Sequence, residues 1–122
     1  MDNLLEVKKS KFYCYYYKVF SKEEVKKIIS NLWLENKKAK HICYAFIVKE
    51  NDIIHYGMTD DKEPRGTAGK PLLNLLQTKN EINSLIVVVR YYGGIKLGAS
   101  TLLRTYVNCA NLIYKNNLNK LN

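Results

Sequence analysis

The segment from Leu85 to Val89 is an unbroken apolar run, and it constrains the fold of this chain more than any other feature. Such a run, rich in β-branched residues, is typical of a central strand buried within a sheet. Residues 11–19, 41–48 and 53–58 are also strand-like. The dipeptide Asn51-Asp52 is a turn signal just before the last of these segments, so we expect the last two to form a hairpin.

Three further segments have the apolar spacing of helices that pack on a sheet. The first follows a capping box formed by Ser21 and Glu24, the second begins around Pro71, and the third follows Ser100. The resulting order, β-α-β-β-α-β-α, predicts a single α+β domain over residues 1–122, with a four-stranded sheet and the helices on one face. We expect residues 116–122 to be a frayed tail.

The chain is strongly basic, and its charge is unevenly distributed. The formal net charge is +9, and the stretch from Ile82 to Asn122 contains no acidic residue. This balance favours nucleic acid, the ribosome or phosphorylated ligands as partners. A base composition that favours lysine, asparagine and isoleucine could produce the same charge, so both explanations stay open.

The cysteines and the apolar runs bear on the cellular compartment. Cys14, Cys43 and Cys109 are odd in number and widely spaced, which argues for reduced thiols in a cytosolic protein and against a zinc site. No apolar run approaches the roughly 20 residues of a membrane span. The first residues lack the basic-then-apolar plan of a signal peptide. We therefore expect a cytoplasmic protein with no membrane partner.

Two glycine-rich loops, residues 60–71 and 90–100, each join a strand-like segment to a helix-like one. They contain five of the 6 glycines, and each has a lysine near the start of the helix. The free N–H groups and the positive dipole end at such a start suit an anion. The candidate ligand-binding or anion-binding residues are His41, Thr67, Gly69, Lys70, Arg90, Gly93, Gly94, Lys96, Ser100 and Arg104.

The first loop begins with an acidic cluster, Asp60, Asp61 and Glu63. Its oxygens could hold Mg²⁺, or one carboxylate could act as a general acid; alternatively, the acids cap the next helix and pair with Arg65 or Lys70. The loop is not an NTPase P-loop, because Pro71 replaces the required Ser or Thr and the glycines are too closely spaced. The pattern identifies no catalytic residue, and no cofactor is expected.

Together, the two loops resemble the signature of the IMPACT/YigZ family. The matching segments read DDKEPRGTAGKP from residue 60, VVRYYGGIKLG from residue 88 and LRTY from residue 103, and Lys9-Ser10-Lys11-Phe12 and His41 also fit. The resemblance covers about residues 8–115 and implies a ribosomal-protein-type split β-α-β fold. Arg65, Ser100-Thr101 and Thr105 depart from the usual family pattern. Family members usually have a second domain, which this chain does not include.

The resemblance implies a role in translation. Eukaryotic members are translational regulators that bind a partner in the amino-acid-starvation pathway, and bacterial members are suggested to bind nucleic acid or the translation machinery. We therefore expect a small binding module that contacts RNA, the ribosome or a protein partner through a cleft where the two loops face each other. The alternatives are an enzyme or sensor for a small phosphorylated ligand with Mg²⁺ at the acidic cluster, and a purely protein-binding adaptor.

Overall fold

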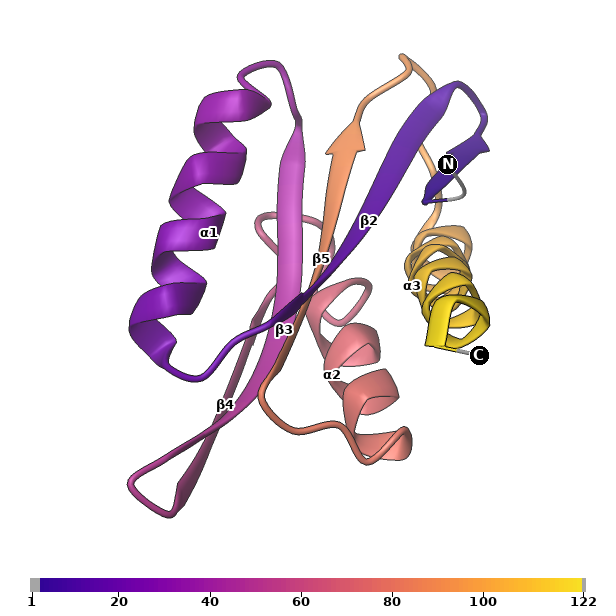
Figure 1. Ribbon diagram of the computed structural model, residues 1–122. Helices are drawn as coiled ribbons and strands as arrows, with labels where there is room; N and C mark the ends of the chain where they lie inside the picture. Colours follow the sequence, from indigo (N-terminus) through magenta and orange to yellow (C-terminus); the bar gives the residue numbers. More distant parts are fainter. Residues whose placement is uncertain (1–2, 122) are drawn as a thin grey trace.

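The computed structural model describes residues 3–121, and the side chains of residues 3–114. The elements are β1 (Leu4–Val7), β2 (Ser10–Lys18), α1 (Lys22–Glu35), β3 (His41–Glu50), β4 (Ile53–Thr59), α2 (Gly69–Thr78), β5 (Ser84–Tyr91) and α3 (Ala99–Leu121) (Figure 1). The strands form one antiparallel sheet in the order β1-β2-β5-β3-β4. The predicted α+β class is confirmed.

Strand β5 lies at the centre of the sheet, between β2 and β3, as the apolar run predicts. Its side chains alternate between the two faces: Ile86 and Val88 belong to one hydrophobic core, and Leu85, Val87 and Val89 belong to the other. All five side chains are fully buried. The strand therefore has an apolar row on each face, and each row has to be covered.

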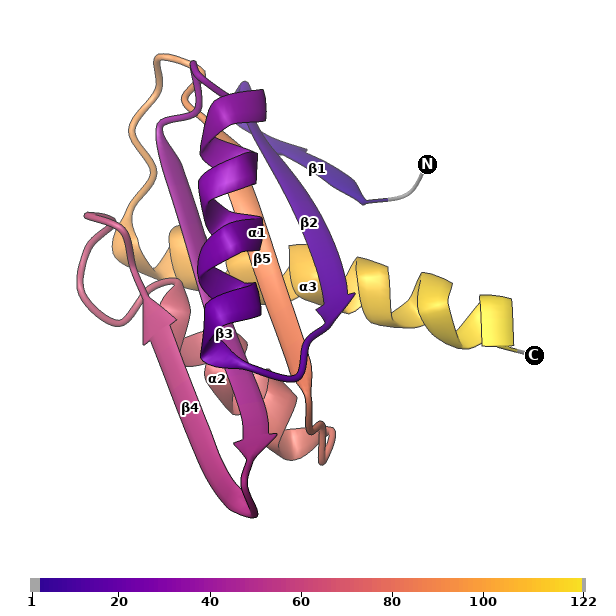
Figure 2. The ribbon, with the colours of Figure 1, turned by 60° about the vertical axis from the view of Figure 1, so that its left-hand side comes forward.

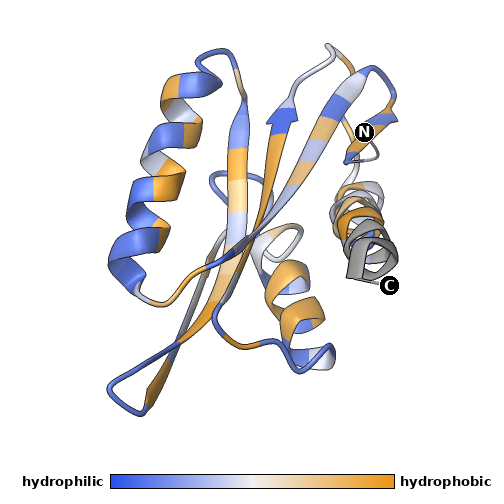
Figure 3. Cartoon of the chain, in the orientation of Figure 1, coloured by the Kyte–Doolittle hydropathy of each residue, from blue (hydrophilic) through white to orange (hydrophobic). Residues whose placement is uncertain are grey.

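The helices cover both faces of the sheet, so the expectation that they lie on one face is wrong (Figures 1 and 2). Leu72 of α2 and Leu102 of α3 pack into the core around Val88, whereas Val25 and Leu32 of α1 pack into the core around Val87. Figure 3 shows that the apolar stripe of α1 faces the sheet and its polar side faces solvent. The two apolar rows of β5 explain this arrangement, since one layer of helices covers only one row.

The sheet has five strands instead of the expected four, because β1 adds to the edge of β2. Lys8 and Lys9 form the two-residue turn between them, with φ of 46° and 70°. Positive φ at both positions is typical of a type I′ hairpin turn, which usually contains asparagine or glycine. Two lysines give no such signal, so the sequence does not reveal this hairpin.

Other local signals are confirmed. The turn residues Asn51 and Asp52 have φ of 51° and 65° and join β3 to β4. The Ser21 hydroxyl accepts a hydrogen bond from the Glu24 backbone N–H at 3.1 Å at the start of α1. The expected fraying of residues 116–122 stays a prediction, and the backbone of α3 is helical as far as Leu121. None of the described helices has the length and apolar character needed to cross a membrane.

The loop that follows β5 packs closely on the β1–β2 turn. A Cβ atom built on Gly93 would lie 2.1 Å from the carbonyl carbon and oxygen of Lys9. The Gly93 N–H also donates to the Ser10 hydroxyl at 3.1 Å. Glycine is therefore needed at this position for close approach of two backbone segments.

We expect Gly93→Ala to lower the free energy of unfolding by about 2–3 kcal/mol, because the new methyl group would overlap the Lys9 backbone. Gly98→Ala is the matched control, since nothing lies within 4 Å of its Cβ position. That change should cost about 1 kcal/mol or less, the usual penalty for alanine at a helix start. Urea denaturation measures both, and equal losses would contradict the packing explanation.

Candidate functional site

Asp60 occupies the start of α2 as an internal anion. Its carboxylate accepts hydrogen bonds from the backbone N–H groups of Gly66 (2.9 Å), Ala68 (3.1 Å) and Gly69 (2.7 Å). The N-cap residue Ala68 has no side chain that could cap the helix. Asp60 therefore satisfies N–H groups that would otherwise be free, and favourably meets the helix dipole. The start of α2 already binds a carboxylate of this chain.

Asp61 ties the first loop to β3. Its carboxylate accepts a hydrogen bond from the Ile42 N–H at 2.8 Å, and its own N–H donates to the Thr59 hydroxyl at 3.0 Å. His41 Nδ1 lies 2.6 Å from the Asp61 carbonyl oxygen. Since a carbonyl only accepts, this nitrogen carries a proton. The loop and the first residues of β3 thus form one rigid unit.

Glu63 is the centre of a buried polar network. Only 7% of the residue is exposed, and its two carboxylate oxygens lie 2.9 and 2.7 Å from Arg90 Nη1. The Tyr106 hydroxyl donates to Oε2, and His41 Nε2 lies 3.5 Å from Oε1. A buried carboxylate is tolerated because these groups replace its lost hydration. Glu63 thereby joins the first loop to β5, β3 and α3.

Arg90 links this network to β2. Its Nη2 donates to the Ser10 hydroxyl at 3.3 Å, and the guanidinium lies over the rings of Phe12 (5.3 Å) and Tyr92 (5.7 Å). Among the described residues, its buried Nε atom has no hydrogen-bond partner. The expected meeting of the two loops is observed, since Glu63 of the first pairs with Arg90, the first residue of the second.

Burial also sets the protonation of the groups beneath the loops. The Cys43 thiol donates to the Asp60 carbonyl at 3.2 Å and lies 3.4 Å from the Tyr106 hydroxyl. Burial, together with the nearby carboxylates, raises the pKa of Cys43, although the bond to Tyr106 lowers it. Burial first, then the charges of Cys43 and Glu63, raise the pKa of Tyr106. Both groups stay neutral donors at physiological pH, so neither is an activated nucleophile.

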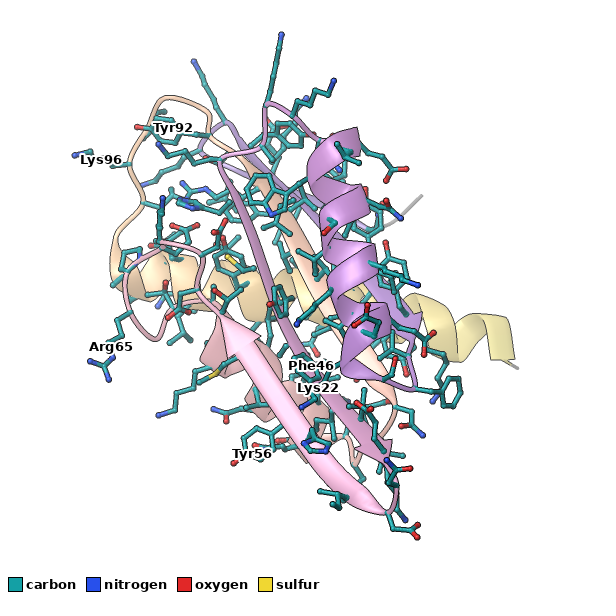
Figure 4. The ribbon with its side chains drawn as sticks, turned by 90° about the vertical axis from the view of Figure 1, so that its left-hand side faces the viewer. Lys22, Phe46, Tyr56, Arg65, Tyr92 and Lys96 are labelled. Atoms are coloured by element: carbon teal, nitrogen blue, oxygen red, sulfur yellow. The ribbon has the colours of Figure 1, made fainter. Side chains whose placement is uncertain are left out.

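A cleft of about 290 Å³ opens above this network. Its lining residues are Lys40, His41, Glu63, Pro64, Arg90, Tyr92, Lys96, Leu97 and Leu102. Lys96 and Tyr92 extend from the β5–α3 loop, and Arg65 extends from the first loop (Figure 4). Because Glu63 is already paired with Arg90, the exposed lysines give this cleft a positive surface.

The candidate residues fall into two groups. His41, Thr67, Gly69 and Arg90 are buried, whereas Lys70, Gly94, Lys96, Ser100 and Arg104 are exposed and Gly93 is half-buried. The Thr67 hydroxyl donates to the Pro64 carbonyl at 2.6 Å. Lys70 does not line the same cleft as Lys96, but a separate groove between α2 and α3. Ser100 and Arg104 lie on the first turns of α3.

The geometry favours a structural role for the acidic cluster over Mg²⁺ binding. The Asp60 oxygens are occupied by three N–H groups, and Asp61 and Glu63 are bonded to Ile42 and Arg90. A metal would have to displace these partners. Within the described part of the chain, no group of three or more His, Cys, Asp or Glu residues is placed to hold a metal ion.

Sequence reasoning did not find Ser10, Tyr106 and Lys40 as parts of this site. Ser10 accepts from both Arg90 and Gly93, and the Tyr106 hydroxyl reaches Glu63. Ser10 and Tyr106 lie within the motifs that carry the family resemblance, which was the available signal. Lys40 lies outside those motifs, and its place follows from the hydrogen bond between its N–H and the Arg90 carbonyl at 2.7 Å.

Exposed cations concentrate at the end of the sheet where β2 begins and β5 ends (Figure 1). We call this region the basic end, and its exposed residues are Lys8, Lys9, Lys11, Lys37, Lys38, Lys40 and Lys96. The opposite end also has lysines, among them Lys18 and Lys49, but they lie near acids: Asp52 at the β3–β4 turn, the nearby Glu50, and Glu81 before β5. The net charge is thus displaced toward the end that contains the cleft.

Known proteins share this sequence and this fold. The Impact N-terminal domain family model matches residues 8–114. IMPACT family member YvyE of Bacillus subtilis (strain 168) is 40% identical over 105 residues, which cover 86% of this chain and 48% of that protein. A crystal structure of an hypothetical protein is similar at a TM-score of 0.82 and 37% identity, over 88% of this chain and 53% of the other.

A more distant structure shares the fold alone. It is that of the two-domain translational regulator Yih1, with a TM-score of 0.60 and 23% identity over 89% of this chain and 45% of the other. The chain thus spans about half the length of the proteins that it matches here.

We expect Glu63→Gln to lower the free energy of unfolding by about 3–5 kcal/mol, because it leaves the buried Arg90 charge without a counter-ion. Asp52→Asn is the control: it also removes one carboxylate, but at an exposed turn position. Its effect should stay within about 0.5 kcal/mol. Urea denaturation of both variants is the measurement, and a loss below about 1 kcal/mol for Glu63→Gln would contradict the central role of this pair.

The raised pKa of the buried Cys43 thiol should make stability depend on alkaline pH. The folded state holds the Cys43 proton above the ordinary cysteine pKa of about 8.5, so stability is full below that pH and falls as pH rises above it. This thiol contributes about 1.4 kcal/mol of the loss per pH unit. Urea denaturation at several pH values should show a shallower decline for Cys43→Ala than for the wild type. Parallel curves would contradict this assignment.

Proposed function

The chain belongs to the Impact N-terminal domain family, and from this premise we propose that it is a translation-associated module that binds RNA through its cleft and basic end. Membership confirms the resemblance seen in the sequence. The translational role is supported by Yih1, which is described as a translational regulator, although its likeness to this chain extends to the fold alone. RNA is the partner that the charge distribution favours.

One observation carries this proposal: the cleft neutralises its buried charges internally and leaves exposed lysines around them. Among residues 3–114, Glu63 forms an ion pair with Arg90, and His41 Nε2 lies 3.5 Å from the same carboxylate. Lys40 and Lys96 line the same cleft and are exposed. Unpaired lysines held on a rigid frame are suited to phosphate groups, whose binding releases counterions.

The internal network also limits what this site does chemically. Asp60, Asp61 and Glu63 position backbone and Arg90, and Cys43 and Tyr106 stay protonated. The geometry therefore supports a binding surface more strongly than an enzyme that uses the acidic cluster. The adaptor alternative places an acidic protein on the same lysines, and the experiment below separates it from RNA binding.

RNA binding should depend steeply on salt and on the cleft lysines. We expect the double variant Lys40→Gln/Lys96→Gln to reduce the slope of log affinity against log salt by about 1.4, which is roughly 0.7 for each lost contact with single-stranded RNA. At about 0.1 M salt this corresponds to a loss of roughly 25-fold in affinity. Fluorescence anisotropy with a labelled oligonucleotide measures both quantities.

The matched control is Lys18→Gln/Lys49→Gln, which removes the same charge from the opposite end of the sheet. It should change the slope and affinity little. Equal effects of the two double variants would indicate non-specific attraction to a basic chain. Absence of salt-dependent RNA binding by the wild type would overturn the proposal and favour the protein-binding adaptor.

A further inference from the structure

A second groove, of about 500 Å³, lies beside the cleft on the face of the sheet that carries α1. Its lining residues are Lys9, Lys11, Tyr13, Tyr15, Asn36, Tyr91 and Tyr92. We call it the tyrosine groove. Tyr92 lines both the tyrosine groove and the cleft, so the two surfaces are continuous at the basic end.

The groove is open because α1 covers only part of this face. The helix lies over β3, and β2 is separated from β3 by β5 in the sheet (Figure 1). The side chains of β2 alternate: Phe12 and Cys14 enter the core under α3, so Lys11, Tyr13 and Tyr15 face the α1 side. Helix α1 covers these tyrosines only in part: they pack against the core that contains Val25 and Leu32 of α1 but stay half-buried.

The rings of the groove are held in place. Tyr13 and Tyr91 pack edge to face, with ring centroids 5.9 Å apart and an angle of 85° between the planes. The Tyr91 hydroxyl donates to the Asn36 side-chain oxygen. Tyr13 and Tyr15 are half-buried, and 45% of Tyr92 is exposed. Such rings present fixed π faces without the entropy cost of ordering them on binding.

The chemistry of the lining points to a ligand with aromatic rings and negative charge. Aromatic side chains with flanking lysines are typical of surfaces that bind single-stranded nucleic acid. The lining contains lysines and tyrosines but no carboxylate. Two acids lie near the groove without lining it: Glu6, opposite Lys11 across the β1–β2 pair, and Glu35, which adds to the effect of burial in raising the pKa of Tyr15.

We propose that the tyrosine groove stacks the bases of single-stranded RNA, while Lys9, Lys11 and the basic end bind its phosphates. This inference rests on the proposed function and specifies the form of RNA. A duplex has no free bases to stack on the tyrosines of the groove, because its bases are already stacked and paired inside the helix. Tyr92 is placed to connect bases in the groove with phosphates in the cleft.

The test compares a single-stranded oligonucleotide with a duplex of the same sequence by anisotropy, over the same series of salt concentrations for both. Tyr15→Leu and Tyr92→Leu should each weaken single-strand binding by at least about fivefold, the loss expected for one stacked base. Duplex binding and the salt slope of single-strand binding should not change, because the lysines are intact. Tyr15→Phe and Tyr92→Phe keep the ring and should bind like the wild type.

Tyr56→Leu is the matched control, since Tyr56 is 64% exposed but lies on β4 at the other edge of the sheet. It should have no effect. Tyr92 is the decisive position if Tyr15→Leu unfolds the protein, because its exposed ring contributes less to the core. If the wild type binds RNA with the expected salt dependence but Tyr92→Leu is unchanged, the tyrosine groove is refuted and the proposed function stands. If the wild type binds neither form, both proposals fail.

Discussion

The buried pair of Glu63 and Arg90 holds the site together, because several parts of the chain meet there. Glu63 comes from the loop before α2, and Arg90 from the end of β5. Through them the network reaches Ser10 on β2 and Tyr106 on α3. A buried ion pair is a weak source of net stability, but removing one partner is costly. The pair therefore acts mainly as a specificity device that fixes how loops and strands are placed.

This internal neutralisation changes the meaning of the net charge of +9. The sequence shows acids and cations in neighbouring loops and leaves open whether they satisfy each other or a ligand. In the structure, Asp60 and Asp61 accept hydrogen bonds from backbone N–H groups and Glu63 pairs with Arg90. The lysines, in contrast, stay at the surface. The net charge alone does not distinguish the paired acids from the exposed lysines, because this distinction depends on burial. The residues of the family signature therefore include those that hold the loops in place as well as those exposed at the surface.

Local patterns predicted what local interactions determine. Three features could be predicted from the sequence because each depends on neighbouring residues. They are the buried strand β5, the turn at Asn51 and the cap at Ser21. The same apolar run implies that helices cover both faces of the sheet. The expectation that the helices lie on one face did not take this into account. The sequence did not predict the hairpin of β1 and β2, because lysines such as Lys8 and Lys9 are unusual at positive φ. Asp60 was read correctly as a possible cap, but its reach to Ala68 and Gly69 depends on how the loop folds back. The presence of Ser10 in the site depends on strand order, which no spacing in the sequence gives.

The contact between Ser10 and Arg90 joins positions that are 80 residues apart. Closing such a long stretch of chain is entropically expensive, and folds dominated by distant pairings form slowly. The site therefore cannot form from the first half of the chain during synthesis. Until β5 has emerged and inserted between β2 and β3, Glu63 lacks its counter-ion and the cleft has no floor. Formation of the site is thus a late, cooperative event that needs the chain through β5 and α3, and an incompletely synthesised product would carry the lysines without the surface that orients them.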